Sequence, residues 1–146
     1  MTGKILVEGP VTMEIISVVL SAEDRKNETG AYSMFLGRVR ADNKGGRVVK
    51  AIEYSAYESM VNHEADDIKQ AILLQFDDVV SLEILHSTGV VKAGEISLLV
   101  LVTGRRRHQA QRACAMIVEM IKERFPVWKK EIYEDNSREW QQPYLA

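Results

Sequence analysis

Basic side chains gather at the two ends of one predicted helix near the C-terminal end of the chain. The run Arg105–Arg107 leads into this segment, Lys122 lies in its last turn, and Lys129 and Lys130 follow it. A helix N-terminus carries free N–H groups and a partial positive charge, and adjacent guanidinium groups add forked donors, so this end suits a phosphate. A partly desolvated lysine has a lowered pKa and can act as a base or a nucleophile. The pattern indicates anion binding with proton transfer, and its alternative is an ordinary solvated basic surface.

The spacing of these cations limits what one ligand can contact. Arg106 and Lys122 are 16 residues apart, which corresponds to roughly 24 Å along a straight α-helix. One small ligand cannot touch both clusters of one chain. Either the clusters serve different purposes, or two copies pack so that Arg106 and Arg107 of one approach Lys122 and Lys129 of the other. We favour the second arrangement.

The end of the predicted helix determines where the lysines point. Pro126 lacks an N–H group and disfavours helical geometry in the residue before it, so the helix should end near Arg124 or Phe125. The residues after Pro126 are expected to form a strand, in which neighbouring side chains point to opposite faces. Lys129 and Lys130 therefore lie on different sides of the sheet. The helix itself is predicted from apolar residues at helical spacing: Ala110, Ala113, Cys114, Ile117, Met120, Ile121 and Phe125.

Other residue types that often carry chemistry have simpler explanations here. Cys114 lies on the apolar stripe of the predicted helix, so we expect it to pack in the core. As the single cysteine of the chain, it can form no internal disulfide. The three histidines are scattered and lack the paired spacing of a zinc site, so no metal site is expected. Phe35 and Trp128 are interpreted as core or interface aromatics, which gives an RNA-binding function little support.

The other elements alternate between strands and single helices. Asn and Gly in ADNKGG favour a turn, so the strands on either side of it are predicted to pair as a hairpin. STGVVKAG is interpreted as a loop, and the segment from about residue 134 as a polar tail. The alternation predicts an α+β domain with a largely antiparallel sheet and about three helices. Strands are expected at Lys4–Glu8, Ala31–Arg40, Val48–Ala56, Val79–His86, Glu95–Val102 and Val127–Tyr133, and helices from Thr12 to about Leu20, over Tyr57–Gln75 and before Pro126.

Composition narrows the class of protein. The chain has 146 residues, of which 46 % are apolar, and this suits a single domain over 1–146 with a real core. No stretch resembles a signal peptide or approaches the ~20 apolar residues that span a bilayer, so we expect a soluble, cytoplasmic protein with no membrane partner. The net charge of −2 gives no overall attraction to nucleic acid, so any anion binding must be local.

Several motifs resemble one enzyme family in order and spacing. MIKERFPVWKKEIYE is similar to the LK…P-[IF]-WK-[KR]-E signature of the large, catalytic subunit of molybdopterin synthase, the MoaE-like proteins. FLGRVR with its Asn/Gly turn, IEYSAYESM, LHSTGVVKAGEISLLVLV and the basic stretch before the last helix resemble the same family in the same order. The resemblance extends from about Met34 to Trp140. WKKE is its most specific part and favours membership of the family.

The resemblance implies a fold, a reaction and partners. It implies an α/β hammerhead fold and a homodimer at the centre of a heterotetramer with two ubiquitin-like small subunits, each ending in a Gly-Gly thiocarboxylate. It also implies two sulfur transfers to cyclic pyranopterin monophosphate (precursor Z), which give the dithiolene of molybdopterin in molybdenum cofactor biosynthesis. The chain would then be a sulfurtransferase that needs neither a metal nor a cofactor for this step.

The functional positions of the family fall on residues of this chain. Lys122 and Lys129 match the two lysines regarded as essential. We assign proton transfer to Lys122 and thiocarboxylate contact to Lys129, and the reverse assignment stays open. Arg106 and Arg107 match a His-Arg pair that enters the site from the opposite subunit, in agreement with the distance between the two clusters. The remaining expected substrate contacts are Arg38, Val39, Arg40, Lys130 and Glu131.

Three positions depart from the family pattern. Arg106 replaces a histidine, which keeps positive charge but removes a group that titrates near neutral pH. Ser87 stands where an arginine is usual, and Ser55 where the family has an acid, and both are expected to alter loop contacts or ion pairs between subunits. With both lysines and Arg40 present, we expect an active enzyme. The alternative is a diverged, non-catalytic dimeric module that binds a ubiquitin-like tail or a phosphorylated pterin.

Overall fold

The computed structural model describes residues 4–23 and 27–141, and within these ranges the chain forms three helices and eight strands. The helices and strands alternate along the chain as a mixed α and β pattern requires. Their bounds are β1 Leu6–Glu8, α1 Met13–Ser21, β2 Ala31–Arg38, β3 Asn43–Lys44, β4 Arg47–Ala56, α2 Glu58–Gln75, β5 Val79–Lys92, β6 Ile96–Gly104, α3 Arg107–Arg124, β7 Val127–Tyr133 and β8 Arg138–Gln141.

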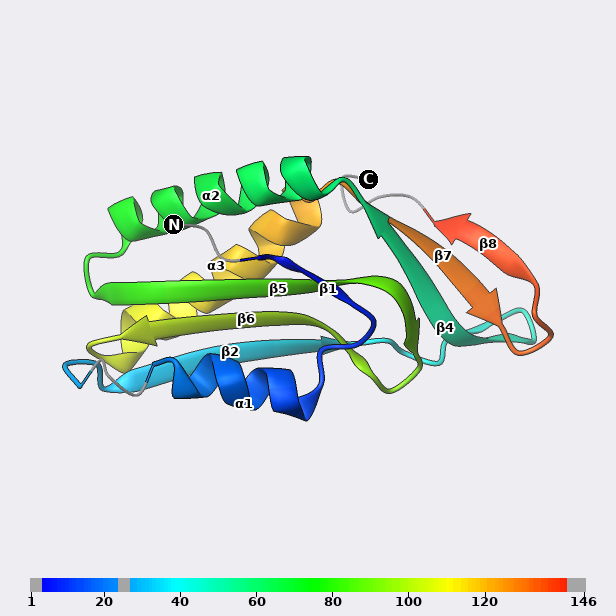
Figure 1. Ribbon diagram of the computed structural model, residues 1–146, viewed down its shortest axis with the longest axis horizontal. Coiled ribbons are helices and arrows are strands. Elements are labelled where there is room, and N and C mark those ends of the chain that lie inside the picture. The colour runs from blue at the N-terminus through cyan, green and yellow to red at the C-terminus, as the bar shows by residue number, and fades with distance from the viewer. Residues whose placement is uncertain (1–3, 24–26, 142–146) are drawn as a thin grey trace.

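The strands build one sheet in the order β2–β6–β5–β4–β7–β8, with β1 beside β5 and β3 beside β4. Among the described residues, all pairings are antiparallel except that of β1 with β5. Figure 1 shows β4, β7 and β8 as an arm inclined to the part formed by β5, β6 and β2. Strand β5 belongs to both parts, and Gly89, with φ at 76°, lies where it passes from β6 to β4. The predicted α+β class and the hammerhead fold are confirmed.

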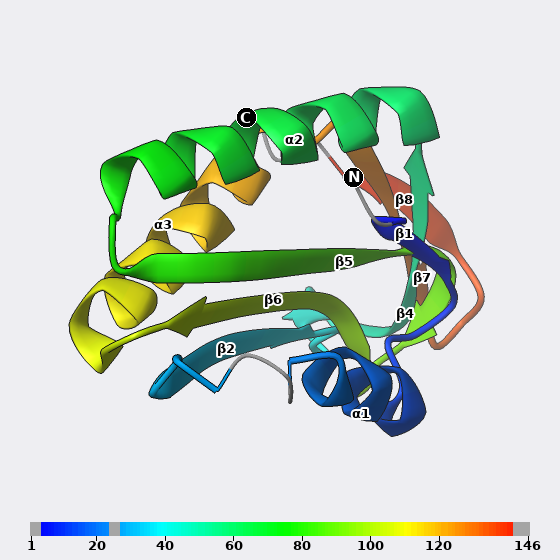
Figure 2. The ribbon, with the colours of Figure 1, turned by 60° about the vertical axis from the view of Figure 1, so that its left-hand side comes forward.

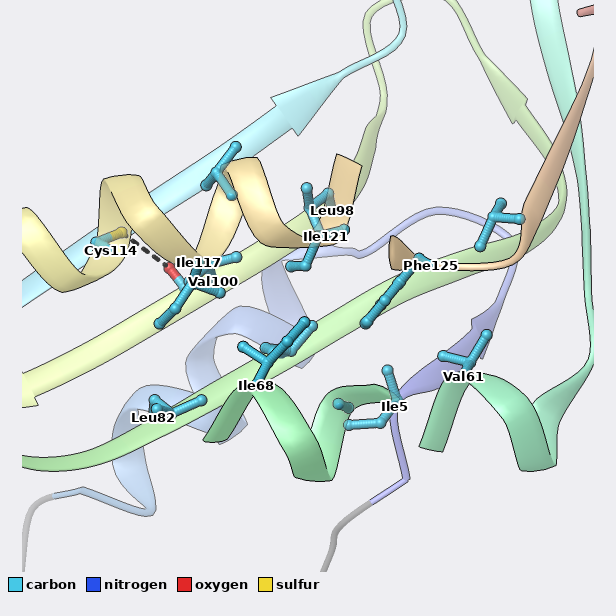
Figure 3. Packing of buried hydrophobic residues seen from close by; sticks show 14 of the residues in the cluster. Ile5, Val61, Ile68, Leu82, Leu98, Val100, Cys114, Ile117, Ile121 and Phe125 are labelled. Atoms are coloured by element: carbon cyan, nitrogen blue, oxygen red, sulfur yellow. Dashed lines mark hydrogen bonds between the residues drawn. The ribbon is translucent and has the colours of Figure 1, made fainter. Parts of the chain in front are cut away.

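The helices cover the two faces of the sheet unequally. Helices α2 and α3 lie on one face and α1 on the other, as Figures 1 and 2 show. The larger core lies under α2 and α3, and a smaller one lies under α1. Strand β6 is buried along its whole length, as expected for a central strand. In Figure 3, Cys114 packs in the larger core with its Sγ 4.0 Å from the Val100 carbonyl oxygen, which confirms its predicted structural role.

Two predicted helix ends are confirmed at atomic detail. The Thr12 hydroxyl accepts a hydrogen bond from the backbone N–H of Ile15 at 3.3 Å and caps α1. Helix α3 ends at Arg124 because Pro126 cannot continue it, and the N–H of Phe125 closes the last turn on the Ile121 carbonyl at 2.9 Å. Strand β7 starts directly afterwards, so the helix and the strand meet at a fixed corner.

The predicted hairpin between the second and third strands is wrong. Strand β2 pairs with β6, and β4 lies between β5 and β7. The ADNKGG turn forms a smaller hairpin of its own, in which Asn43 and Lys44 of β3 face Val48 and Arg47 of β4. A turn signal specifies only the residues next to it. The partner of β2 is decided by burial instead, because β6 needs a neighbour on each side.

Two further segments are more ordered than the sequence indicated. The predicted loop STGVVKAG is mostly strand, since β5 continues to Lys92 and the turn is confined to residues 93–95. Gly89 takes the positive φ at the bend, and the residues after it pair with β4. In the predicted polar tail, β8 pairs with β7, while residues 142–146 lie outside the described ranges. In the part of the chain that is described, no helix has the length and apolar character needed to cross a membrane.

Candidate functional site

A pocket of about 380 Å³ opens where the end of β2, strands β4, β6 and β7 and the last turn of α3 meet. Six of the nine predicted site residues line it, whereas Lys130, Arg106 and Arg107 do not. The predicted residues in its wall are Arg38, Val39, Arg40, Lys122, Lys129 and Glu131, and the others are Phe35, Leu36, Gly37, Asp42, Ile52, Tyr54 and Leu98.

The corner between α3 and β7 brings the two lysines together. Lys122 lies in the last turn of α3, where the helix dipole favours a cation. Phe125, which is fully buried, anchors the corner in the core, and Lys129 follows as the third residue of β7. Both lysines line the pocket and repel each other electrostatically. Because the chain turns sharply at Pro126, Lys122 and Lys129 lie in the same pocket although one belongs to a helix and the other to a strand.

Lys129 is the lysine whose environment favours the loss of a proton. It lies opposite Tyr54 in the neighbouring strand and is half-buried. Burial lowers the pKa of Lys129 below its ordinary value, and the charge of Lys122 lowers it further, while Glu131 acts in the opposite direction. An amine in this state can accept or donate a proton nearer to neutral pH than a surface lysine can.

Glu131 is the buried acid of the pocket. Its side chain is 8 % exposed, and it accepts hydrogen bonds from Lys44 Nζ at 2.6 Å and from the Tyr133 hydroxyl at 3.1 Å. The bond to Glu131 raises the pKa of Lys44, which therefore stays charged. Since Lys44 belongs to β3, this ion pair ties the β3–β4 hairpin to β7. Glu131 is thus placed to hold the pocket wall together while balancing part of its positive charge.

The end of β2 and the residues directly after it supply two guanidinium groups that are held differently, since β2 ends at Arg38 and not at Arg40 as predicted. Arg38 donates from Nε to the Gly94 carbonyl at 2.9 Å. Arg40 donates to the Asp42 carboxylate from Nε at 2.6 Å and from Nη2 at 3.3 Å. Between them, Val39 is buried, and its N–H and carbonyl are bonded to the backbone of the β5–β6 turn. Val39 therefore positions the two arginines, and its N–H is already used within the protein.

Lys130 lies on the opposite face of β7, as its place next to Lys129 predicts. Its Nζ is 4.4 Å from the centre of the Trp140 ring, over which it stacks. Trp128 lies on the same face, where it packs edge-to-face against Tyr57 with ring centroids 5.6 Å apart. Together with Ser55 and Ala56, these aromatics line a separate, mostly apolar pocket. The structure thus separates Lys130 from the first pocket of the same chain, the one that Lys122 and Lys129 line, hereafter the cationic pocket.

Arg106 and Arg107 lie at the other end of α3. Arg106 is the N-cap residue, and Asp78 accepts bonds from its backbone N–H at 2.9 Å and from its Nη2 at 3.1 Å. The Asp78 side chain is 6 % exposed, and the bonds from Arg106 lower its pKa. Asp78 therefore offsets the unfavourable cation at this helix end. Arg107 begins the helix with its side chain exposed. Neither arginine reaches the pocket of its own chain.

The chemistry available to the pocket follows from its charges. Cations from β2, α3 and β7 surround a space large enough for a small ligand, with two acids among them. Guanidinium groups suit the paired oxygens of a phosphate, and a lysine with a lowered pKa suits proton transfer. Within residues 4–23 and 27–141, no group of three or more His, Cys, Asp and Glu side chains is placed to hold a metal ion. The arrangement fits binding of an anionic substrate with acid–base chemistry.

Tyr54 lines the pocket and His86 packs behind it, and neither was identified from the sequence. Tyr54 lines the pocket opposite Lys129, and its hydroxyl donates to Ser97 Oγ at 3.1 Å. His86 is fully buried behind it, with the two rings edge-to-face at 5.2 Å, and the His86 Nδ1 is 2.8 Å from the Ser87 carbonyl. Both residues fall in ordinary strand patterns. No local signal distinguishes them, because their role depends on a pairing that only the fold creates.

We predict that His86 makes the protein sensitive to acid. Burial lowers the pKa of His86 from 6.5 to about 4, so the folded state keeps it neutral while the unfolded state gains a proton below pH 6.5. Its contribution to stability is complete above pH 6.5 and is lost as the pH falls toward 4. The free energy of unfolding should drop by roughly 3 kcal/mol more in the wild type than in His86→Gln over this range. Urea unfolding at several pH values measures it, and equal slopes for the two proteins would contradict it.

The structure also places two of the residues that differ from the family pattern, Ser87 and Ser55. Ser87 is fully buried in β5 beside Val7 of β1, and its hydroxyl has no hydrogen-bond partner among the described residues. Ser55 lies opposite Trp128, on the face of the sheet away from Lys129. Neither serine lines the cationic pocket. Their effect on that pocket is therefore indirect.

Comparison with known proteins points to one family. The chain matches the family model described as MoaE protein over residues 10–124. It is 39 % identical over 122 residues to a molybdopterin synthase catalytic subunit from Pyrococcus abyssi (strain GE5 / Orsay), which covers 84 % of this chain and 78 % of that protein. It is 33 % identical over 138 residues to the protein of the same name from Drosophila melanogaster, covering 94 % of this chain but 36 % of that longer protein.

Solved structures agree with this likeness. The X-ray structure of molybdopterin synthase from Staphylococcus aureus matches with a TM-score of 0.84 and 30 % identity, over 97 % of this chain and 98 % of that one. A chain in the complex of subunits 1 and 2 of molybdopterin-converting factor from Helicobacter pylori 26695 shares the fold, with a TM-score of 0.79 and 22 % identity over 94 % of this chain and 89 % of that one.

Proposed function

This chain belongs to the MoaE protein family, and from that premise we propose that it is the catalytic subunit of a molybdopterin synthase, with the cationic pocket as its active site. The observation that carries the proposal is the convergence of Arg38, Arg40, Lys122 and Lys129 in one pocket. These residues come from the end of β2 and the segment directly after it, from α3 and from β7, and they meet only through the fold. They are also the positions that the family motifs single out.

The proposed substrate is cyclic pyranopterin monophosphate. Its phosphate carries paired oxygens that a guanidinium fork can bind, and both arginines at the end of β2 border the pocket. The second reactant, the thiocarboxylate at the Gly-Gly end of a ubiquitin-like small subunit, is also an anion. Bringing two anions together requires cations around them, because like charges repel. The charge of the pocket thus supports both parts of the proposed reaction.

Sulfur transfer gives the lysines separate tasks. The thiocarboxylate sulfur attacks a side-chain carbon of the pterin, and a C–S bond forms as the C–O bond at that carbon breaks, its oxygen leaving with the phosphate or, once protonated, as water. Water then attacks the thioester carbonyl and cleaves the acyl–sulfur bond, which releases the carboxylate of the small subunit and leaves the sulfur on the pterin. A cation stabilises the tetrahedral intermediate, and a second group moves protons. The lowered pKa of Lys129 supports proton transfer by Lys129 and contact with the thiocarboxylate by Lys122. This is the reverse of the assignment first preferred from the sequence.

Reconstitution tests the proposed function directly. The purified protein is mixed with a ubiquitin-like small subunit that ends in a thiocarboxylate and with cyclic pyranopterin monophosphate, and molybdopterin is assayed. The expected result is product that depends on both reactants. Binding of both reactants without any product would contradict the catalytic function and favour the non-catalytic module.

We also propose that the active protein is a homodimer in which the arginines before α3 complete the site of the partner subunit. The separation along α3 supports this, because Arg106 caps the start of this 18-residue helix and Lys122 lies in its last turn. Strand β2 also supports it. Its exposed Tyr32, Met34 and Phe35 would be covered by a second copy, and Phe35 borders the pocket. Two small subunits bound to this dimer would make the heterotetramer that the family resemblance implies.

Mixing two inactive variants should restore activity if the site is shared between subunits. Lys129→Ala and Arg107→Ala are expected to be poorly active alone. In a heterodimer of the two, one site combines Lys129 and Arg107 from intact chains, so co-expression should recover up to about a quarter of the wild-type sites. The measurement is molybdopterin formation by the co-expressed and by the separately purified proteins. Activity that stays at the sum of the single variants would show that each site is built within one chain.

A further inference from the structure

The cationic pocket contains two acids, and they differ in how firmly they are held. Glu131 is buried and bonded to both Lys44 and Tyr133, so it cannot exchange its partners without breaking the pocket wall. Asp42 also borders the pocket, but its carboxylate is bonded to the guanidinium of Arg40. The Arg40 side chain is 84 % exposed, whereas that of Asp42 is 33 % exposed. The pair is therefore open to an incoming ligand on the side of Arg40.

The backbone fixes Asp42 while leaving Arg40 able to move. The N–H of Asp42 donates to the Arg40 carbonyl at 2.9 Å, and the Asp42 carbonyl accepts from the N–H of Val49 at the same distance. Asp42 thus lies at the start of the β3–β4 hairpin, which the ion pair between Lys44 and Glu131 ties to β7. A long arginine side chain can turn toward a ligand, but this carboxylate keeps its place.

We propose that Asp42 competes internally for Arg40: the Asp42 carboxylate holds the Arg40 guanidinium, and an anionic ligand must displace that carboxylate in order to bind there. The inference rests on the proposed function, in which Arg40 contacts the phosphate of the substrate. Asp42 occupies the same Nε and Nη2 donors that a phosphate fork would use. The Asp42 carboxylate consequently occupies the position of the ligand's oxygens, and it lowers the apparent affinity of any anion that binds to Arg40.

The size and form of the effect follow from simple competition. When only a fraction of the protein has the guanidinium available, the apparent dissociation constant of every ligand that uses Arg40 rises by the same factor. Exposed ion pairs of this kind are weak, so the factor is about two- to fivefold. An anion that binds only to Lys122 and Lys129 escapes this factor. Removing the charge of Asp42 therefore reveals which reactant binds at Arg40.

The test uses inorganic phosphate as the probe and calorimetric titration at constant ionic strength and pH 7.5. Wild type, Asp42→Asn, Arg40→Ala and the double variant are compared, and thermal melting checks that each is folded. Asp42→Asn should bind phosphate about two- to fivefold more tightly than wild type. In the Arg40→Ala background, the same change should have no effect. Asp42→Ser repeats the test with a shorter neutral side chain if the asparagine variant is poorly folded.

Each remaining outcome decides against the proposal in a recognisable way. Equal tightening with and without Arg40 would mean that Asp42 acts only through its general negative charge. An unchanged affinity in Asp42→Asn, or no binding of phosphate to any variant, would also overturn it. The molybdopterin assay is run separately on the same proteins. If wild type makes no molybdopterin but Asp42→Asn still binds phosphate more tightly in an Arg40-dependent way, the proposed function is wrong and the competition stands. If wild type makes molybdopterin but Asp42→Asn does not bind phosphate more tightly, only the competition is wrong.

Discussion

Replacing Lys129 with alanine should lower molybdopterin formation by about a hundredfold or more while the protein still binds the small subunit. Positioned acid–base groups contribute about 10²–10⁴ in rate, and burial gives Lys129 the lowered pKa that such a role needs. Lys122→Ala is expected to be comparably impaired, because it removes the cation that we propose stabilises the negative intermediate. The measurement is the single-turnover rate with saturating small subunit and substrate. Loss of binding rather than of rate would favour the non-catalytic module.

Lys130→Ala is the matched control for this prediction. Lys130 is adjacent in sequence and equally charged, but it stacks on Trp140 on the other face of β7. Its loss should leave the rate close to that of the wild type. A reduction as large as that of Lys129→Ala would show that overall charge, not position in the pocket, governs the reaction.

Lys129→Met separates catalysis from stability. The folded state carries a cost for the buried charge of Lys129, and this cost is complete below the lowered pKa and disappears as the pH rises toward 10.5, the ordinary lysine value. The methionine variant should therefore be inactive yet melt at a higher temperature than the wild type at pH 7, with the difference shrinking at high pH. A lower melting temperature at pH 7 would contradict a desolvated lysine.

Of the variants described above, Phe125→Ala should lose the most stability, about 3–5 kcal/mol in the free energy of unfolding. Phe125 is fully buried at the corner between α3 and β7, and its ring lies 6.2 Å from that of His86. Removing the ring leaves a cavity beneath the strand that carries Lys129. Figure 3 shows Phe125 among the labelled residues of the larger core, which also include Ile5 and Ile121, and Phe125 is 0 % exposed. Urea unfolding at pH 7 gives the value.

The same variant should also be catalytically impaired at temperatures where it remains folded, because the corner sets the distance between Lys122 and Lys129. Phe125→Leu serves as the control, since it keeps most of the apolar volume and should cost about 1 kcal/mol. An alanine variant that is unstable but has wild-type turnover in the folded state would show that the corner is not what aligns the lysines.

Local patterns predicted the elements of this fold well. Helix α3 and its end before Pro126 follow from spacing and from the geometry of proline, and the cap at Thr12 follows from its side-chain oxygen. The opposite directions of Lys129 and Lys130 follow from the strand repeat. Each of these features depends on residues within a few positions of one another, and so the sequence contains the whole signal.

Features that depend on distant pairing were predicted less well. The prediction that β2 pairs with the strand after the ADNKGG turn is wrong, because a local turn signal cannot outweigh the burial of β6, which pairs with β2. The segment of β5 beyond Gly89 has the sequence pattern of a loop, because a bend at Gly89 joins two strand segments that pair with different neighbours. Tyr54 and His86 were missed at the site for the same reason. Their position beside Lys129 and Phe125 arises only when β4, β5 and β7 lie side by side.

The pairing of β2 with β6 also bears on how the chain reaches its native state. During synthesis β2 emerges before β3, β4, α2 and β5, and its only described strand partner is β6, which is made after all of them. Contacts so distant in sequence slow folding, because a long loop must close first. Until then both edges of β2 are unpaired, and its Tyr32, Met34 and Phe35, which stay partly exposed even in the folded chain, are not shielded by β6. A nascent chain that stalls before β6 would thus display a segment prone to aggregation and suited to capture by a chaperone.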